Sequence, residues 1–132
     1  MSDKIPPVGR ARPFPWRCFE CRAKEVFPKA LYFVAEENGV VLGQIMLTSE
    51  WSDWRNGWIW WIQSVYVRQD ARRRGVFRKL YRHVHEEASR APDVIGLRLY
   101  VERENQPAQQ TYVNLGMEAT SYLVFECYPL TP

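Results

Sequence analysis

The chain has 132 residues, of which 46% are hydrophobic and 25% charged, a composition typical of one globular domain. Its densest apolar run, residues 59–62, is far shorter than the roughly 18 residues that a membrane span requires. Residues 1–8 hold one lysine and two prolines, so we expect no signal peptide. Three cysteines do not close a disulfide framework. We therefore expect a cytoplasmic protein with no membrane association.

The net charge of +3 is unevenly distributed along the chain. Residues 68–82 contain seven basic side chains and a single acid, Asp70. Such a local excess of positive charge predicts an anionic partner. Five of the six tryptophans fall within residues 51–61. We expect Trp58, Trp60 and Trp61 to pack in the core of a strand, and Trp51 and Trp54 to line a pocket from a loop.

The first 30 residues are predicted to form an irregular arm. Five of the nine prolines lie there, and at most a short helix is expected over residues 17–27. Cys18 and Cys21 form a lone CxxC with no second ligand pair. Because a structural zinc site takes four ligands, we expect no metal site and interpret both cysteines as small apolar residues on that helix.

Alternating and helical patterns begin at Leu31. Residues 31–36 and 40–48 predict two strands joined by Asn38-Gly39, the dipeptide favoured in tight hairpins. Residues 50–57 are polar and turn-like, and residues 58–68 predict a long strand. Gly75 begins a helix that ends before Pro92, with apolar residues at i, i+4 spacing along one face.

The last third of the chain predicts a strand, a helix and a strand. Residues 96–102 alternate as a strand, the helix runs from Pro107 to Gly116, and residues 119–128 form the final strand. The apolar stripe of this helix is Ala108, Tyr112 and Leu115. The order of elements predicts an α/β domain with a mixed sheet over residues 31–132, preceded by the arm of residues 1–30.

A glycine-bearing turn that leads from a strand into a helix is a candidate phosphate site. It directs several backbone N–H groups at one point, where the helix dipole adds partial positive charge. Arg72, Arg73, Arg74 and Arg78 add full charges around Gly75, which lets a ligand approach the backbone closely. A run of arginines alone would be read as a solvated surface, but here the strand, glycine and helix align with it. The natural ligand of such a site is a diphosphate.

Two motifs carry a resemblance to a known family. Val65-Tyr66-Val67, followed by Arg72-Arg73-Arg74-Gly75-Val76-Phe77, resembles the acetyl-CoA-binding motif of the GCN5-related N-acetyltransferases (GNAT), Arg/Gln-x-x-Gly-x-Gly/Ala. Asn105-x-x-Ala108-x-x-x-Tyr112-x-x-x-Gly116-Met117 resembles a second motif of that family. The resemblance covers residues 31–128. It implies a GNAT-like mixed, largely antiparallel twisted sheet flanked by helices, with a shortened N-terminal region.

The resemblance also implies roles for individual residues. The edge of Val65, Tyr66 and Val67 would pair with the pantetheine arm, and backbone amides from Arg73 through Val76 and Phe77 to Arg78 would hold the pyrophosphate. Arg72 occupies the first position of the motif. Asn105 would hydrogen-bond near the pantetheine, and Tyr112 would face the thioester sulfur. Phe77 departs from the motif, which prefers glycine or alanine, and both Val76 and Phe77 also fit a packing role.

Acetyl transfer to a primary amine requires a neutral amine, a donor for the developing oxyanion and an acid for the leaving thiolate. A backbone N–H near Val65 could serve as the donor. Tyr112 is the candidate acid, since the pKa of tyrosine, about 10, suits a thiolate of similar basicity; the alternative is a packed core tyrosine. Glu50 and Asp53 are candidates for the base or for binding a cationic acceptor; the alternative is an ordinary surface loop.

In the GNAT family a strand and one or two helices precede the hairpin and wall the acceptor site, whereas this chain has only the arm. The wall is then minimal, or a second subunit completes it, or the chain is a degenerate member. We predict a homodimer on this basis. The alternatives to an acetyltransferase are a non-catalytic acyl-CoA sensor and a nucleic-acid module that uses the basic segment, of which the latter is the less favoured.

Overall fold

The computed structural model describes residues 2–3, 16–21 and 30–131. It divides into a sheet unit, residues 1–100, and a second unit, residues 101–132. The sheet unit contains β1 (Ser2–Asp3), β2 (Trp16–Cys21), β3 (Ala30–Glu37), β4 (Val40–Ser52), β5 (Gly57–Val67), a 3₁₀ turn (Gln69–Ala71), α1 (Val76–Arg90) and β6 (Val94–Leu99). The second unit contains α2 (Gln106–Asn114).

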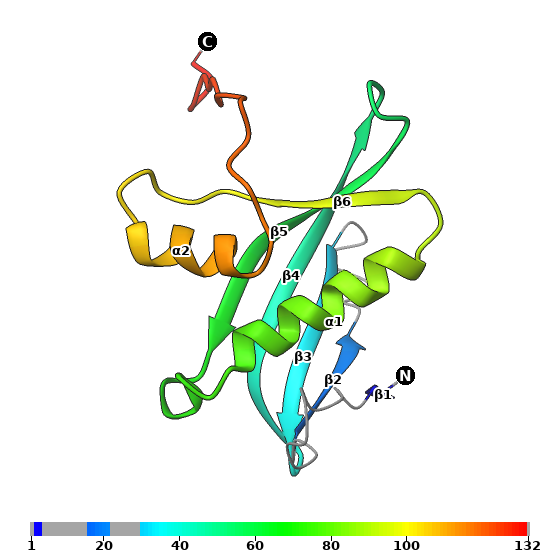
Figure 1. The fold of residues 1–132 in the computed structure, drawn as a ribbon, viewed down its shortest axis with the longest axis vertical. Coiled ribbons are helices and arrows are strands. Elements are labelled where there is room, and N and C mark those ends of the chain that lie inside the picture. The colour runs from blue at the N-terminus through cyan, green and yellow to red at the C-terminus, as the bar shows by residue number, and fades with distance from the viewer. Residues whose placement is uncertain (1, 4–15, 22–29, 132) are drawn as a thin grey trace. The chain divides into compact units, whose positions relative to one another are not determined.

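The six strands form one mixed sheet in the order β1-β2-β3-β4-β5-β6 (Figure 1). Every neighbouring pair is antiparallel except β5 and β6, which run parallel. Parallel neighbours need a crossover connection, and α1 supplies it. The expected mixed, largely antiparallel sheet is therefore confirmed.

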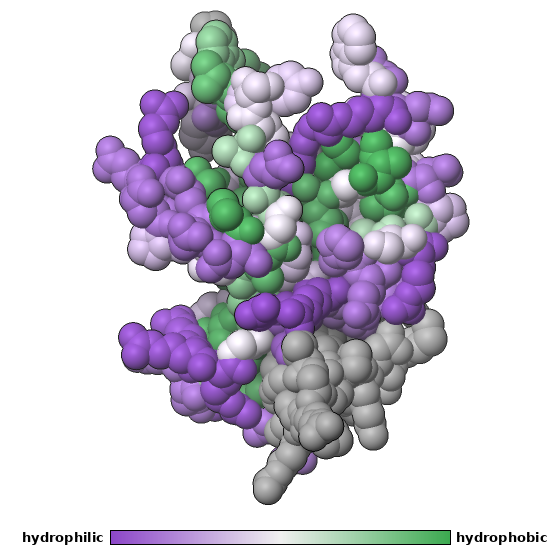
Figure 2. Space-filling view, in the orientation of Figure 1, coloured by the Kyte–Doolittle hydropathy of each residue, from purple (hydrophilic) through white to green (hydrophobic). Residues whose placement is uncertain are grey.

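Helix α1 lies across one face of the sheet (Figure 1). Val76, Leu80, Val84 and Ala88 are all buried, as their i, i+4 spacing predicts. The sheet contributes Phe33, Ile45 and Leu47, each fully buried, to the core beneath the helix. The outward surface of the helix is mainly hydrophilic (Figure 2). This packing fixes the start of α1 beside the end of β5.

The predicted β3–β4 hairpin forms, and the turn predicted over residues 50–57 is shorter than expected. Asn38 and Gly39 have φ of 51° and 81°, the left-handed conformations that a tight β3–β4 turn requires. β4 continues to Ser52, so the β4–β5 turn spans only residues 53–56. Trp51 and Trp58 lie opposite each other with ring centroids 5.1 Å apart, and this cross-strand pair extends the ladder.

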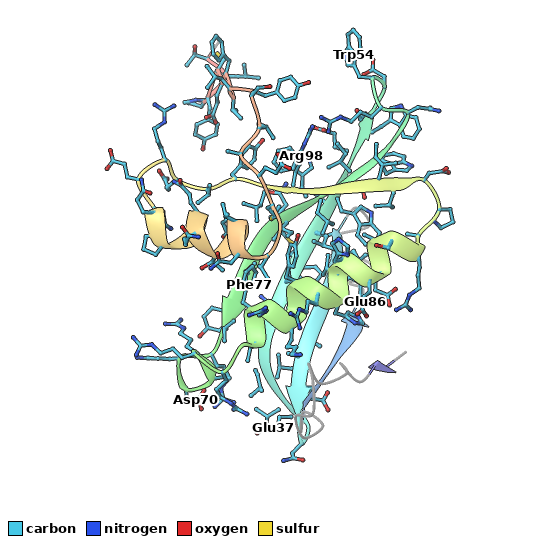
Figure 3. All side chains as sticks on the ribbon, in the orientation of Figure 1. Glu37, Trp54, Asp70, Phe77, Glu86 and Arg98 are labelled. Carbon is cyan, nitrogen blue, oxygen red and sulfur yellow. The ribbon has the colours of Figure 1, made fainter. Side chains whose placement is uncertain are left out.

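The tryptophans are less buried than predicted. Trp58 is 40% exposed, and Trp60 and Trp61 are half-buried. Trp54 is 96% exposed at the tip of the β4–β5 hairpin, where Figure 3 labels it. A side chain this exposed does not line a pocket in the turn. The reason is that α1 covers the middle of the sheet, whereas the hairpin extends beyond it (Figure 1).

Two predictions of local structure are wrong. Residues 16–21 form β2, which pairs along its whole length with β3, rather than part of a helix. Cys18 and Cys21 therefore lie on a strand, and the remainder of the expected helix lies outside the described residues. Residues 119–128 form no strand in the described part of the second unit. A strand needs a hydrogen-bonded neighbour, and the described part of that unit offers only α2.

Candidate functional site

Strands β5 and β6, the last two strands of the sheet, diverge halfway along β5, and we call this point the fork. Their pairing ends where Ile62 meets Leu99, while β5 continues to Val67. Among the described residues, no strand pairs with that edge of β5 from Gln63 to Val67. The predicted edge residues Val65 and Tyr66 are exposed there. This free edge offers N–H and C=O groups to an extended ligand, as an added strand would use them.

A β-bulge on β5 coincides with this fork. On β4, Leu47 pairs with Ile62 and the adjacent Met46 pairs with Ser64, so Gln63 is the extra residue. The Gln63 side-chain amide donates a hydrogen bond to Thr48 Oγ1 at 2.9 Å. A bulge bends its strand and leaves one residue outside the regular ladder. The bulge therefore lies where the free edge of β5 begins.

The predicted anion site lies directly after the free edge. Arg73 and Gly75 both have positive φ, 64° and 78°, and this curls the backbone between β5 and α1. The first helical hydrogen bond runs from the Lys79 N–H to the Gly75 carbonyl at 3.1 Å. The N–H groups of residues 76–78 precede it and point out of the helix end. The backbone thus forms the concave set of amides that a diphosphate requires.

Glycines serve two different purposes around this loop. A Cβ added at Gly75 would meet no atom within 4 Å, so the space in front of the loop is open. A Cβ added at Gly43 of β4 would lie 2.9 Å from the Tyr66 carbonyl and 3.1 Å from the Val76 side chain. Gly43 therefore allows β4, β5 and α1 to pack closely beneath the loop.

The structure divides the basic segment into paired and available cations. Arg68 forms an ion pair with Asp70, and Arg74 donates to Glu37 Oε2 at 2.7 Å. Lys79 is only 5% exposed, and burial, together with the charges of Arg82 and Arg78, lowers its pKa below 10.5. A local charge sum includes all three cations as surface charge, because neither pairing across the fold nor burial is visible in the sequence.

Three arginines in the loop and the first turn of α1 remain available to an anion. Arg72 donates from Nε to the Val67 carbonyl at 3.0 Å, which leaves its terminal nitrogens outward beside the Tyr66 ring. Arg73 and Arg78 are exposed and form no ion pair within the described part of the chain. These guanidinium groups flank the curled backbone, so the loop combines oriented amides with full positive charges. The residues present fit a diphosphate group.

Val76 and Phe77 contribute in different ways. Val76 is 2% exposed, so only its backbone could face a ligand. The Phe77 ring, labelled in Figure 3, lies 6.4 Å from the ring of Tyr81 on the same helix. This packing against Tyr81 gives a reason for the large Phe77 side chain at a position where the motif prefers glycine or alanine.

The second motif forms α2 in the second unit. Asn105 is the N-cap, and its side-chain oxygen accepts a hydrogen bond from the Ala108 N–H at 3.2 Å. Tyr112 lies on the half-buried face of α2 with Ala108 and Leu115, as predicted. Gly116 has φ of 95° just beyond the helix. Asn105 therefore has a structural role as the cap of α2.

The two predicted acids lie towards the far end of β5 from the anion site. Glu50 of β4 pairs with Ile59 of β5. Ile59 lies four residues before Gln63 on β5, a separation of about 13 Å along the strand. Asp53 lies in the hairpin turn and accepts a hydrogen bond from the Trp54 N–H. Figure 3 shows Trp54 and Asp70 at opposite ends of β5. Neither acid is adjacent to the bulge.

Glu50 belongs to a cluster that the sequence analysis missed. Arg98 donates to Glu50 Oε1 at 3.1 Å, and its guanidinium lies 5.9 Å from the Trp61 ring centre. Tyr100 packs on Trp61 with centroids 4.5 Å apart. The alternation of residues 96–102 predicts that Arg98 and Tyr100 share a face, but the partner strand is not evident from the sequence.

A family model for the acetyltransferase (GNAT) family matches residues 4–117. The chain belongs to this family. A possible acetyltransferase of known structure from Clostridium difficile 630 is 32% identical, with a TM-score of 0.78. The match covers 89% of this chain and 100% of that one. Among curated proteins, none matches the sequence.

More distant GNAT structures share the fold. An aminoglycoside acetyltransferase from an uncultured soil metagenomic sample, solved with sisomicin, is 14% identical over 78% of this chain and 67% of that one, with a TM-score of 0.67. The aminoglycoside N-acetyltransferase AAC(6')-Iy, solved with CoA, is 22% identical over 77% of this chain and 68% of that one, with a TM-score of 0.64. The protein is thus an acetyltransferase of the GNAT family, whose members use acetyl-CoA.

No helix among the described residues is long and apolar enough to cross a membrane. In the same residues, no three His, Cys, Asp or Glu side chains are grouped closely enough to hold a metal ion.

Proposed function

We propose that this GNAT protein transfers an acetyl group from acetyl-CoA to a primary amine by direct attack of the amine on the thioester. The observation that carries the proposal is the continuity of the fork and the anion site. The free edge of β5 begins at the bulged residue Gln63 and ends at Val67, directly before the curled loop and the start of α1. One extended ligand with a diphosphate at one end fits this path.

The residues of the sheet unit would hold the cofactor through backbone groups. Amides of residues 73–78 would bind the diphosphate, with Arg72, Arg73 and Arg78 beside it. The free edge at Val65, Tyr66 and Val67 would pair with the amide groups of pantetheine. The Nδ2 group of the Asn105 side chain would serve as a donor for the same arm, since the helix cap uses the Oδ1 atom.

Acetyl-CoA supplies an activated acyl group, and the protein supplies orientation and proton transfer. A backbone N–H near Val65 would donate to the carbonyl oxygen as the amine attacks and negative charge develops. The carbon–sulfur bond then breaks, and Tyr112 would give its phenolic proton to the leaving thiolate. The attacking amine loses one proton to water or a base, so an amide and free CoA are the products.

Glu50 is better placed to bind a cationic part of the acceptor than to remove the proton of the attacking amine. The separation of about 13 Å along the strand from Gln63 excludes direct proton transfer at the bulge. Arg98 holds only one carboxylate oxygen, and the Tyr100 ring beside it is 61% exposed. A carboxylate next to aromatic faces attracts an ammonium group. Asp53, farther out in the turn, is the weaker candidate for the same role.

The proposal is tested by direct detection of acetylated product with a panel of amines that includes monoamines, diamines and aminoglycosides. Thermal unfolding with acetyl-CoA at 100 times its dissociation constant should add about 2.7 kcal/mol, or roughly 5–10 °C in Tm. Glu50→Gln should raise KM for a diamine several-fold and leave KM for a monoamine unchanged. Glu86→Gln is the matched control, since Glu86 is an exposed acid that pairs with an arginine, Arg90, on α1. Stabilisation by acetyl-CoA without transfer to any amine would contradict catalysis and favour a sensor.

A further inference from the structure

Four side chains form a cluster on the face of the sheet opposite α1. Leu47, which is buried beneath α1, alternates along β4 with Thr48, and Thr48 pairs with Trp61 of β5. Trp61 therefore lies on the other face. Arg98 of β6 pairs with Trp61, and the Tyr100 ring packs on the Trp61 ring. The paired-charge cluster consists of Glu50, Trp61, Arg98 and Tyr100.

The paired-charge cluster borders the fork. Leu99 is the last residue of β6 that pairs with β5, and Arg98 and Tyr100 are its two neighbours in the chain. Trp61 lies two residues before Gln63, where the free edge of β5 begins, so the Arg98 position is about 7 Å along the strand from that point. The proposed cofactor path has its acyl end at the same point. A small molecule held by the cluster can therefore present one of its ends to the thioester.

The two charges of the cluster are joined by a single contact. Arg98 Nη1 donates to Glu50 Oε1 at 3.1 Å, and among the described residues neither group has a second hydrogen-bond partner. The side chain of Glu50 is 47% exposed and that of Arg98 is 23% exposed. Because an ion pair with this exposure adds little to the stability of a fold, stability alone does not explain it. Within this part of the chain, the second carboxylate oxygen and the remaining guanidinium N–H groups stay available to a ligand.

A pair of opposite charges selects a different ligand from a lone carboxylate. A lone carboxylate attracts any cation, whereas the Arg98 guanidinium beside it repels a second ammonium group and attracts a carboxylate. The head group of an α-amino acid carries an ammonium and a carboxylate on one carbon atom, so each of its charges finds an opposite one in the pair. The Tyr100 ring, 61% exposed, offers an apolar surface to the methylene groups of the amino-acid side chain.

We propose that the acceptor is a free α-amino acid whose side chain ends in a primary amine, an inference that rests on the proposed acetyl transfer. Glu50 binds the α-ammonium, Arg98 binds the α-carboxylate, and the side-chain amine reaches the thioester. Lysine fits the distance, because five bonds of about 1.5 Å each separate its α-carbon from its amine and span about 6 Å when extended. The amine nitrogen forms the amide bond as the carbon–sulfur bond of acetyl-CoA breaks, the amine loses one proton and the thiolate gains one.

Three acceptors that differ by one group test the proposal. Cadaverine is lysine without the carboxylate, and 6-aminohexanoate is lysine without the α-ammonium. The wild type should use lysine with a kcat/KM at least tenfold higher than that of either, and mass spectrometry should locate the acetyl group on the side-chain nitrogen. A kcat/KM for cadaverine or 6-aminohexanoate equal to that for lysine, or acetylation of the α-nitrogen, would overturn the proposal and leave acetyl transfer to amines intact.

Substitutions of the two charged residues should affect lysine and cadaverine differently. Arg98→Met should lower kcat/KM for lysine at least tenfold and lower KM for cadaverine, because it removes a charge that repels the second ammonium. Glu50→Gln should raise KM for both and should not impair 6-aminohexanoate. Arg90→Met is the matched control, since Arg90 is an exposed arginine that pairs with an acid on α1. A purely structural role of Arg98 would impair lysine and cadaverine alike, and that result would contradict the proposal.

Binding of norleucine separates this proposal from the proposed activity. Norleucine has the same head group and no side-chain amine, so isothermal titration in the presence of CoA measures head-group binding without any transfer. The wild type should bind it, and Glu50→Gln and Arg98→Met should each bind it at least tenfold more weakly. A wild type that does not bind norleucine would overturn the proposal. Norleucine binding without acetylation of any amine would refute the transfer, and with it the role of the amino acid as acceptor, while the head-group site stands.

Discussion

Replacement of Gly75 by glutamate provides a sharp test of the anion site because the chain contains a matched control. Gly75 and Gly39 have nearly the same φ, 78° and 81°, and an added Cβ would meet nothing within 4 Å at either position. A non-glycine residue in this conformation costs about 1–2 kcal/mol. Gly75→Glu and Gly39→Glu should therefore lose similar free energy of unfolding, whereas only Gly75→Glu places a carboxylate at the anion site.

The magnitude follows from Coulomb's law. A carboxylate about 6 Å from one phosphate charge is repelled by about 2.8 kcal/mol at an effective dielectric constant of 20, and by about 0.7 kcal/mol in bulk water. With two phosphate charges, the affinity for CoA should fall at least about tenfold, since 1.4 kcal/mol corresponds to a factor of ten. The exposure of Gly75 places the effect toward the lower end of the range.

Isothermal titration of CoA into both variants measures this difference. Gly39→Glu should bind as the wild type does, within about twofold, while Gly75→Glu binds more weakly and recovers part of the difference at high salt. Gly75→Ala separates the two effects, because alanine introduces the backbone strain of a positive φ without adding a charge. Equal affinity of the two glutamate variants would refute the assignment of the diphosphate to this loop.

Two further outcomes are expected of side chains in the helices. Tyr112→Phe should lower kcat at least tenfold and leave the affinity for acetyl-CoA unchanged; an unaffected kcat would exclude Tyr112 as the acid. Burial lowers the pKa of Lys79 below 10.5, so the unfolded state binds its proton more tightly and the free energy of unfolding rises as the pH increases toward 10.5. Urea unfolding of the wild type and of Lys79→Met at pH 7 and at about pH 10 measures this dependence. Between the two pH values, the free energy of unfolding of the wild type should increase relative to that of the variant.

The sequence predicts those parts of the fold that depend on local pattern. The β3–β4 turn follows from Asn38-Gly39, and α1 follows from a four-residue apolar spacing that begins at a glycine. The end of α2 at Gly116 follows in the same way. In each case the residues that determine the structure lie within a few positions of one another, so no knowledge of distant partners is needed.

The remaining features depend on contacts between distant segments. Residues 16–21 become a strand because β3 pairs with them, and residues 119–128 form none in the described unit because nothing there pairs with them. The ion pair of Arg74 with Glu37 joins residues 37 positions apart, and that of Arg98 with Glu50 joins residues 48 apart. The curled loop between β5 and α1 could therefore be predicted from local sequence, whereas the side-chain contacts around Glu50 depend on distant partners and could not.

The single extra residue at Gln63 also sets which side chains of β5 enter the core. Side chains alternate along a strand, so Ile62 and Val65 would point to opposite faces in an uninterrupted one. Because Ile62 pairs with Leu47 and Val65 pairs with Ile45, both lie on the face of α1. If Gln63 took a regular position in the ladder instead of forming the bulge, Ser64 and Tyr66 would turn inward against the helix. The bulge beside the free edge of β5 thus also keeps the second half of β5 in phase with the face of the sheet that α1 covers.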